Sequence, residues 1–515
     1  MDEPAVDFLD RAAALEQLGE RPFDLLVVGG GIIGAGIACE AARAGLGVAL
    51  VERADFGSQT SSASSKLIHG GLRYLRLGDI RLVREAHRER RALMQVVAPH
   101  LVRRLPFLLP VYRNGPYPAL AVQAGLWAYS ALAGERHGRM VAPERARRSV
   151  PSLRVDELRG CGVYADAWTH DGRLCLANVQ GASEAGATVA NYVEVTLVRV
   201  AGGRAVGAEV ADRIGGASFT VTARAVVNAT GPWIDHVRRL EDESAPPSMR
   251  LSKGVHVFLE LAEPWRAALT IPHDRVRVSF AVPWEGMLLL GTTDAPYEGD
   301  PDELEVSEKD IETVLAEAAV ALEPEALTTD AVRSTSAGLR VLPNVRGHTT
   351  RARRETVFLR GPAGMLTVAG GKLTTYRRIA LTALNALRSE LGLPVLAGEP
   401  APLPGAVPLG EAVELLARSH PELEPALRFH LAHLYGSRAE KVLEPARADP
   451  TLLERLDPAA PDIAAQALYA REREWACTAD DVLRRRTTVA ARGRVETSLV
   501  ARVESVLAKP STRRA

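Results

Sequence analysis

The order of apolar and polar positions near the start of the chain predicts a strand, a tight turn, a helix and a second strand. Residues 23–28 form an apolar run that ends at the glycine-rich turn 29–34. An alanine-rich segment, 35–44, predicts a helix, and a second short apolar run covers 48–51. This succession is typical of a βαβ unit, in which a helix joins two parallel strands. The residues before it, 8–18, predict a short N-terminal helix.

After residue 190 the pattern changes to an alternation of apolar and polar residues. This alternation over 192–200, 205–210 and 218–227 predicts paired strands. Residues 277–292 predict two further strands around a Pro-Trp-Glu-Gly turn, and 306–322 has the spacing of a helix. Because strands and helices mix until about residue 390, the predicted fold class is α/β, or α+β for the whole chain.

Prolines mark the clearest boundary in the chain. The segment 393–410 has prolines at positions 394, 400, 402, 404 and 408, so it cannot form a regular helix and is interpreted as an extended linker. The residues from 411 to 507 have a helical composition. A separate C-terminal helical domain is therefore expected.

Composition narrows the class of protein. With 515 residues, 47% hydrophobic and 24% charged, the chain is expected to form two or three packed units rather than a disordered or fibrous protein. Its 63 basic and 63 acidic residues cancel, so no overall charge attracts it to nucleic acid. The four cysteines (Cys39, Cys161, Cys175 and Cys477) include no close pair, which argues against a disulfide framework or a cysteine-based metal centre. A reducing compartment fits best, and no metal is expected.

Neither a targeting segment nor a membrane span is expected. Residues 1–20 contain six acidic residues and one basic residue, the opposite of a signal or transit peptide. The apolar segment 119–133 is shorter than the roughly 20 residues that a transmembrane helix needs.

The glycine turn after the first strand has the spacing of a dinucleotide-binding fingerprint. In Gly29-x-Gly31-x-x-Gly34, the first glycine permits the tight turn, the second lets a pyrophosphate approach the backbone, and the third lets the helix pack on the strand. Glu52 ends the second strand, where a carboxylate can bind the adenosine ribose hydroxyls and disfavours NADP. NAD and FAD remain open. The strand and small-residue turn 225–233 resembles the second FAD contact of glutathione-reductase-type flavoproteins.

Six ordered motifs carry a more specific resemblance. They are TSSASSKLIHGGLRYL (60–75), NATGPW (228–233), KGVH (253–256), GTTD (291–294), SAGLRVLP (336–343) and GGKLTTYR (370–377). Together they resemble the FAD-dependent glycerol-3-phosphate dehydrogenases, which belong to the D-amino-acid-oxidase-like flavoproteins, over about residues 21–500.

The resemblance implies a Rossmann-like FAD-binding domain of glutathione-reductase type, an interleaved β-rich substrate domain and a C-terminal helical domain. The expected division is an N-terminal extension (1–22), an FAD-binding domain (23–392) with cap segments at about 95–160 and 250–340, the linker (393–410) and the helical domain (411–515).

The same resemblance implies an activity. It is the oxidation of sn-glycerol 3-phosphate to dihydroxyacetone phosphate, by hydride transfer from C2 to N5 of FAD, in the catabolism of glycerol and glycerophospholipids. The electrons would pass to a membrane quinone. Two other enzymes stay open: an oxidase that passes electrons to O2 and makes H2O2, and an FAD-dependent amino-acid oxidase. A flavin-binding protein without enzyme activity is a third alternative.

The residues of the motifs provide candidates for each task of this reaction. Neutral imidazole suits proton transfer near neutral pH, so His69 and His256 are candidate proton acceptors. Lys372 could polarise the substrate oxygen. Arg340 is the fourth candidate catalytic residue. The candidate substrate-binding residues are Arg73, Tyr74, Thr293, Arg340 and Arg354. The candidate FAD-binding residues are Gly29, Gly31, Gly34, Glu52, Thr60, Ser61, Ser65, Lys66, His69, Gly70, Gly71, Val195, Ala229, Gly231, Lys372, Leu373 and Thr374.

Local charge suggests where the molecule meets a membrane. Residues 66–104 carry ten basic and three acidic residues, and 484–515 carry nine and two. With the apolar segment 119–133 they could dock on an anionic bilayer surface. Alternatively, 119–133 is a buried helix over the substrate cavity. The expected location is cytoplasmic and peripheral, on the inner face of the cell membrane. The expected assembly is a homodimer.

Overall fold

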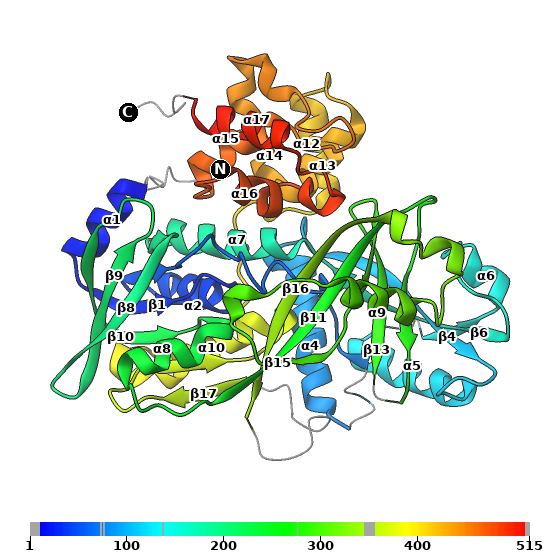
Figure 1. Ribbon diagram of the computed structural model, residues 1–515, viewed down its shortest axis with the longest axis horizontal. Coiled ribbons are helices and arrows are strands. Elements are labelled where there is room, and N and C mark those ends of the chain that lie inside the picture. Colours follow the sequence, from blue (N-terminus) through cyan, green and yellow to red (C-terminus); the bar gives the residue numbers. More distant parts are fainter. Residues whose placement is uncertain are drawn as a thin grey trace.

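The computed structural model describes residues 11–72, 75, 78–135, 138–275, 277–344 and 356–509. Two β-sheets lie side by side in Figure 1, and the helices of the C-terminal region gather above them. The first sheet, on the left, contains the N-terminal strands. The second sheet, on the right, is formed largely by the middle of the chain.

The first sheet has a parallel core assembled from distant parts of the chain. Its strands are β1 (Phe23–Val28), β2 (Val48–Val51), β7 (Thr188–Ala190), β8 (Val193–Ala201), β9 (Arg204–Asp212), β10 (Ser218–Asn228), β17 (Val357–Arg360) and β18 (Leu366–Ala369). β1 pairs in parallel with β2 and β10, β2 with β7, and β10 with β18. β8, β9 and β10 form an antiparallel ribbon, and β17 is antiparallel to β18.

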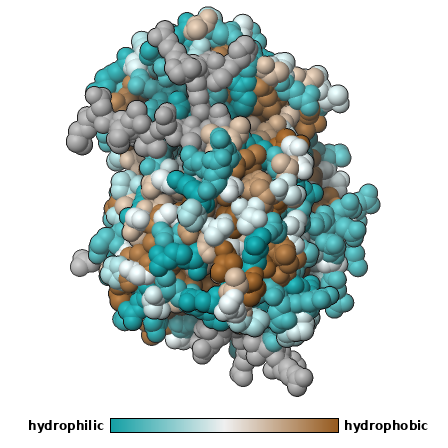
Figure 2. All heavy atoms as spheres, turned by 90° about the vertical axis from the view of Figure 1, so that its left-hand side faces the viewer, coloured by the Kyte–Doolittle hydropathy of each residue, from teal (hydrophilic) through white to brown (hydrophobic). Residues whose placement is uncertain are grey.

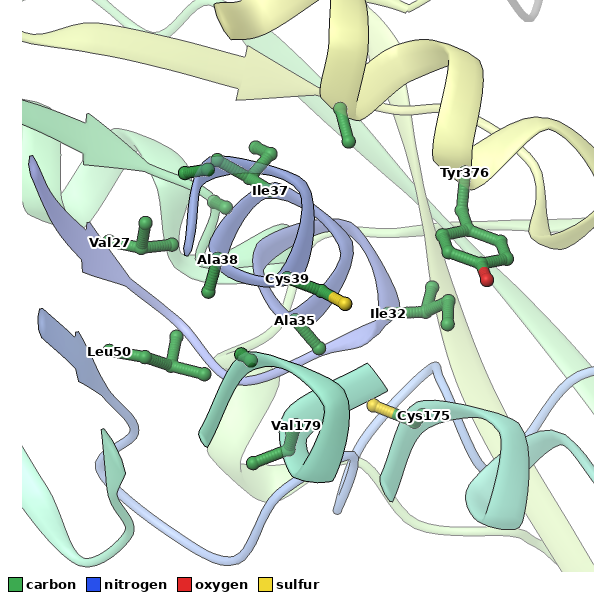
Figure 3. Packing of buried hydrophobic residues seen from close by; sticks show 14 of the residues in the cluster. Val27, Ile32, Ala35, Ile37, Ala38, Cys39, Leu50, Cys175, Val179 and Tyr376 are labelled. Atoms are coloured by element: carbon green, nitrogen blue, oxygen red, sulfur yellow. The ribbon is translucent and has the colours of Figure 1, made fainter. Parts of the chain in front are cut away.

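Both faces of the parallel core are buried, which explains the continuous apolar runs of its strands. On one face, Val27 and Leu50 join a core shared with α2 (Ile32–Arg43), α7 (Asp171–Glu184) and α10 (Tyr376–Ala386). Figure 3 shows α2 packed between the strands and these two helices. The glycine-rich turn after β1 is thereby held between a strand and a helix that are both fixed in the core.

The strands predicted at 23–28 and 48–51 are confirmed as β1 and β2. The helix predicted at 35–44 begins earlier, at Ile32, because Gly31 has extended backbone (φ −72°, ψ 174°) and serves as the N-cap of α2. The predicted N-terminal helix is α1 (Arg11–Glu20), and residues 8–10 lie outside the described residues. An ion pair of 2.5 Å between Arg11 and Asp212 ties α1 to β9.

The second sheet, beside the first, is called the cap sheet below. Its strands are β3 (Leu67–Ile68), β4 (Arg103–Tyr112), β5 (Arg139–Val141), β6 (Leu158–Trp168), β11 (Met249–Glu260), β12 (Ala268–Pro272), β13 (Val278–Trp284), β14 (Met287–Gly291), β15 (Ala295–Tyr297) and β16 (Val332–Pro343). The two strands predicted within 277–292 are confirmed as β13 and β14, and the helix within 306–322 is α9 (Glu308–Ala318).

The cap sheet extends beyond the predicted cap segments of about 95–160 and 250–340. β6 continues to Trp168, and its end pairs with the short β3, where Leu67 lies opposite Trp168. β3 belongs to the loop that follows the first βαβ unit. This pairing brings that loop directly beside the cap.

The C-terminal helices have a core of their own. They are α12 (Leu409–Ser419), α13 (Pro425–Tyr435), α14 (Ala439–Leu443), α15 (Ala464–Arg473), α16 (Ala479–Asp481) and α17 (Thr497–Leu507). Residues 393–408 contain no helix or strand, as their prolines predict. The other α-helices of the described residues are α4 (Ile80–Ala92), α5 (Ala119–Ala133), α6 (Pro143–Arg147), α8 (Ile234–Glu241) and α11 (Arg388–Leu391).

On the side of the molecule shown in Figure 2, hydrophobic groups lie among hydrophilic ones rather than in one continuous band. Within the described ranges, no helix is both long and apolar enough to cross a membrane.

Candidate functional site

A cavity of about 860 Å³ is lined by residues of both sheets. The first sheet contributes the glycine-rich turn after β1 and the turn after β10. The second sheet contributes residues of β4, β6, β13 and β16, and the serine-rich loop before β3 lies between them. The volume is near the upper end of the range for cofactor and small-molecule sites.

The glycines of the fingerprint are required by close backbone contacts. Gly29 has a φ of +105°, and a Cβ atom there would lie 2.7 Å from the backbone oxygen of Ala229. A Cβ atom on Gly34 would lie 1.9 Å from the backbone oxygen of Gly29. Gly34 therefore allows α2 to pack on β1, whereas Gly29 and Gly31 line the cavity. The N-terminus of α2 can bind an anion there, through unpaired N–H groups and the helix dipole.

Glu52, which directly follows β2, lies on the cavity wall, as does Val195 of β8. Its Oε2 accepts a hydrogen bond from the backbone N–H of Gly30 (2.7 Å), and its Oε1 accepts one from that of Ala54 (2.9 Å). Burial raises the pKa of Glu52, while the two N–H donors act against this increase. Its carboxylate is thus fixed at the point where an adenosine ribose is expected.

The serine-rich loop connects the glycine turn with the cap. The Ser61 hydroxyl accepts a hydrogen bond from the first N–H of α2 (2.9 Å), and the Thr60 hydroxyl donates to the backbone oxygen of Leu339 in β16 (3.0 Å). Ser65 Oγ lies 2.9 Å from Nε2 of His256 in β11. Hydrogen bonds therefore join the loop to α2 of the first sheet's layer and to β16 and β11 of the cap sheet.

His256 is a buried, neutral histidine on the cavity wall. Burial, with the positive charges of Arg340 and Lys66, lowers the pKa of His256 to about 3. Its Nε2 contacts the Ser65 hydroxyl, whereas its buried Nδ1 has no hydrogen-bond partner among the described residues.

Arg340 on β16 presents a guanidinium group to the cavity. It donates hydrogen bonds to Oγ1 of Thr292 (2.8 Å) and to the backbone oxygen of Thr293 (3.0 Å). A longer ion pair of 3.4 Å joins it to Asp294. These contacts fix the direction of the guanidinium, which is a suitable group for binding a phosphate.

A turn before α10 lies across from the loop that contains His69. Lys372 has extended backbone and is followed by the short 3₁₀ turn Leu373–Thr375. The backbone N–H of His69 donates to Oγ1 of Thr374 (3.1 Å), and the His69 ring lies 6.3 Å from that of Phe280. His69, Phe280, Lys372 and Thr374 all line the cavity.

Helix α5 forms a further part of the wall. Val122 and Gly125 line the cavity, whereas Leu120 and Trp127 have exposed fractions of 87% and 65%. The segment 119–133 is therefore a helix over the cavity, as one of the two interpretations predicted, but it is not fully buried, because large apolar side chains lie on its outer surface.

Most of the predicted site residues are brought together around this one cavity. Those on its wall are Gly29, Gly31, Glu52, Thr60, Ser61, Ser65, His69, Gly71, Val195, Ala229, Gly231, His256, Arg340, Lys372, Leu373 and Thr374. Those away from the wall are Gly34, Lys66, Gly70 and Thr293. Arg73, Tyr74 and Arg354 lie outside the described residues.

The residues away from the wall have other contacts. The Lys66 ammonium is buried in an ion pair of 2.6 Å with Asp171. The backbone N–H of Gly70 donates to Oδ1 of Asp166 (3.1 Å). The Thr293 hydroxyl accepts a hydrogen bond from the backbone of β11 (3.0 Å). These residues hold the backbone around the cavity rather than facing it.

Several residues of the cavity wall were not among those predicted from the sequence. Arg277, at the start of β13, provides a second guanidinium and pairs with Glu317 of α9. Tyr164 and Asp166 are two positions apart on β6, so alternation could have placed them on one face. No local pattern indicates that Thr270 lies 2.6 Å from the Tyr164 hydroxyl.

In the described part of the chain, no group of three or more His, Cys, Asp or Glu side chains is arranged to hold a metal ion.

Residues 24–377 match the family model described as FAD dependent oxidoreductase, and residues 398–512 match that of the C-terminal domain of alpha-glycerophosphate oxidase. The chain is 34% identical to a glycerol-3-phosphate dehydrogenase of Synechocystis over 498 residues, 92% of this chain and 90% of that one. It is 36% identical to a probable mitochondrial glycerol-3-phosphate dehydrogenase of Caenorhabditis elegans over 493 residues, 91% of this chain and 68% of that one.

Solved structures give a consistent result. The glycerol-3-phosphate dehydrogenase of Bacillus halodurans, complexed with FAD, superposes with a TM-score of 0.77 at 30% identity, covering 96% of this chain and 91% of that one. The L-alpha-glycerophosphate oxidase of Mycoplasma pneumoniae, with FAD bound, has a TM-score of 0.56 at 16% identity, covering 75% of this chain and 99% of that one, and shares the fold.

Proposed function

The chain belongs to the family of FAD-dependent glycerol-3-phosphate dehydrogenases, and from this premise we propose that it oxidises sn-glycerol 3-phosphate to dihydroxyacetone phosphate in glycerol catabolism. The observation that carries the proposal is that the wall of this cavity contains both the dinucleotide fingerprint and the Arg340 guanidinium. An oxidoreductase of a phosphorylated alcohol needs a cofactor site and an anion site side by side.

The residues of the cavity fit FAD. Gly29 and Gly31 leave the backbone at the N-terminus of α2 accessible to a pyrophosphate, and Glu52 presents a carboxylate on the cavity wall for ribose hydroxyls. When bound, FAD supplies the acceptor at N5 for the hydride from C2 of the substrate.

For the substrate, Arg340 and Arg277 offer guanidinium groups to the phosphate. Lys372 is proposed to polarise the C2 oxygen. The wall facing these cations is apolar in part, from Phe280 and α5, and a low-polarity wall strengthens charge interactions inside the cavity.

We assign the proton acceptor to His69 rather than His256. A histidine whose pKa is about 3 is a weak base near neutral pH, and Nε2 of His256 is already in contact with Ser65. His69 lies on the cavity wall next to the Lys372 turn, with its backbone tied to Thr374. In this assignment His256 anchors the serine-rich loop and His69 takes the hydroxyl proton.

Anaerobic titration of the FAD-bound protein tests the substrate. Addition of sn-glycerol 3-phosphate should bleach the flavin absorbance, and amino acids should not. Arg340→Ala should raise the concentration for half-bleaching at least about tenfold, because hydrogen bonds to charged groups contribute about 1.5–3 kcal/mol. Arg333→Ala is the matched control, since Arg333 lies on the same strand but pairs with Glu260 at the surface. Equal affinities for wild type and Arg340→Ala would contradict the phosphate assignment.

We propose a membrane quinone as the electron acceptor. The relatives named above are dehydrogenases, which supports this acceptor, whereas the model matched by residues 398–512 takes its name from an oxidase. Reduction of a soluble quinone analogue, measured beside H2O2 formation in air, separates the two. Formation of one H2O2 for each substrate oxidised would show that the protein is an oxidase and not a dehydrogenase.

Exposed apolar and basic side chains support a peripheral position on the inner face of the cell membrane. Leu120 and Trp127 of α5 are exposed, and α5 packs against α4, whose Arg84 and Arg88 are exposed. An apolar side chain beside basic ones suits an anionic bilayer surface. Co-sedimentation with vesicles containing anionic phospholipid should fall on Trp127→Glu but not on Val395→Glu, an equally exposed position in the linker. The homodimer stays a prediction, which a measurement of the molar mass in solution by light scattering would test.

A further inference from the structure

The C-terminal helical region reaches the adenosine end of the dinucleotide site through one segment, residues 474–486. The ring of Trp475 lies edge-on to that of Phe56, with centroids 5.5 Å apart and an interplanar angle of 84°. The backbone oxygen of Trp475 accepts a hydrogen bond from Asn191, at the end of β7 (2.7 Å). The segment therefore contacts the first sheet beside the loop that follows Glu52.

Asp55 in that loop is the main charged contact. Its carboxylate is buried and forms ion pairs with Arg485 and Arg486 of the C-terminal region, with one Arg486 nitrogen 2.8 Å from Oδ1. Burial by itself would raise the pKa of Asp55, but the charges of the two arginines hold it below its usual value. Arg486 is completely buried. A buried ion pair of this kind fixes geometry, because breaking it leaves an uncompensated charge.

The loop 52–57 contacts the fingerprint turn on its other side. Glu52 accepts the hydrogen bond from the N–H of Gly30 described above, and the N–H of Gly57 donates to the backbone oxygen of Gly30 (3.1 Å). A Cβ atom on Gly30 would lie 2.4 Å from the Phe56 ring. The loop thus lies between the fingerprint turn and the C-terminal segment and contacts both of them.

We propose that the C-terminal helical region controls the affinity for FAD, with Arg486 and Trp475 as positioning residues. They hold Asp55 and Phe56, and these hold the Glu52 carboxylate and the fingerprint turn in their binding positions. Neither Arg486 nor Trp475 lines the cavity, so they act through the loop and not by contact with FAD. Because coupling between two sites is reciprocal, FAD binding should in turn stabilise the contact of segment 474–486.

Titration of the apoprotein with FAD, followed by flavin fluorescence, tests the proposal without any substrate. Arg486→Met and Trp475→Leu should each raise the Kd for FAD at least about fivefold, the lower end of typical coupling between sites. Arg486→Lys should recover part of the loss, since it restores the charge opposite Asp55. With saturating FAD, kcat and KM should stay within about twofold, since coupling acts on FAD affinity.

Glu285→Gln is the matched control. Glu285 pairs with His433 of α13 (3.0 Å), so this variant weakens another contact of the C-terminal region, made with the β13–β14 turn. Its Kd for FAD should equal that of wild type. If the Arg486 and Trp475 variants lose only thermal stability and keep the wild-type Kd, their role is structural and the proposal is wrong.

Hydrogen exchange of the wild-type protein provides a second test that needs no variant. Addition of FAD to the apoprotein should slow exchange of the backbone amides in segment 474–486, which lies outside the cavity. Unchanged exchange there, with slowed exchange at residues 29–34, would overturn the proposed coupling. If sn-glycerol 3-phosphate failed to bleach the flavin in the earlier titration, the proposed substrate would be wrong, but the expected results of these two FAD-binding tests would not change.

Discussion

Lys66 and Asp171 form a buried ion pair directly beneath the serine-rich loop. The ammonium and carboxylate are 2.6 Å apart, and both side chains are almost completely buried. The other carboxylate oxygen accepts hydrogen bonds from the hydroxyl (2.7 Å) and the N–H (3.1 Å) of Ser64. Burial opposes ionisation, but the Lys66 charge lowers the pKa of Asp171. The pair therefore fixes the loop that carries Ser65 to His256.

Asp171→Asn should destabilise the protein strongly. The substitution leaves the Lys66 ammonium buried without its counter-charge, and breaking one partner of such a pair costs about 3–5 kcal/mol. The measurement is the free energy of unfolding from urea denaturation of the holoprotein. The double variant Lys66→Met/Asp171→Asn removes both charges and should recover part of the loss. A single variant as stable as wild type would mean that the pair is solvated.

At the level of single residues, the sequence predicts which residues line the cavity, but not the ion pairs that hold these residues in place. Glu52 and Arg340 lie in short motifs whose spacing already implies their chemistry. Lys66 lies in such a motif too, yet its side chain points to Asp171, 105 positions away. Asp166 likewise meets Arg90, 76 positions away. Contacts over such separations depend on the tertiary fold and leave no local pattern.

Among the elements, the junction of β1 with α2 depends most directly on one residue. Gly34→Ala should abolish or greatly weaken FAD binding, because the added Cβ would lie 1.9 Å from the backbone oxygen of Gly29 and would push α2 away from the strand. Overpacking of a buried site costs typically about 1–3 kcal/mol. The yield of bound flavin after purification, together with the Kd of the apoprotein for FAD, measures the effect.

Gly410→Ala controls for the loss of a helical glycine as such. Gly410 lies in α12, is exposed, and has no atom within 4 Å of an added Cβ. Alanine favours the helix by about 1 kcal/mol over glycine, so this variant should be slightly more stable than wild type and bind FAD normally. Normal FAD binding by Gly34→Ala would show that α2 can shift without disturbing the site.

Elements with a strong local pattern were predicted well, and pairings between distant elements were not. β1, β2 and the β13–β14 hairpin follow from apolar runs and turn residues. β3 has only two residues and exists because Leu67 and Ile68 pair with the end of β6. That pairing depends on the register of the whole cap sheet, so neither β3 nor the extension of β6 to Trp168 could be predicted from local periodicity.

On the scale of the whole molecule, the basic stretches are not simply surface charge. Arg90, within 66–104, is buried against Asp166, and Arg485 and Arg486, in the basic tail, are buried against Asp55. These arginines join separate parts of the fold. The zero net charge of the chain thus includes ion pairs between distant segments, and the surface available to an anionic membrane is smaller than the sequence counts imply.

Buried neutral histidines should make the stability of the whole molecule sensitive to acid. Burial, with the nearby Lys66 charge, lowers the pKa of His170 to about 3, and burial next to His433 lowers that of His100 to about 3. The unfolded chain has histidine pKa values of about 6.5, so below that pH it binds protons that the folded protein does not. The contribution of these histidines to the free energy of unfolding should therefore be constant above about pH 7 and fall as the pH decreases from about 6.5 towards 3.

His170→Asn tests this dependence because it removes one titration and keeps the local structure. Nδ1 of His170 caps α7 by accepting a hydrogen bond from the N–H of Arg173 (3.3 Å), and asparagine is also a favourable N-cap. Urea denaturation at about pH 7, 6 and 5 should give a shallower loss of stability for the variant, by up to about 1.4 kcal/mol per pH unit. Since the cap remains, the difference between the two curves isolates the proton bound by His170 on unfolding. Parallel curves would mean that this histidine is already protonated, or exposed to solvent, in the folded protein.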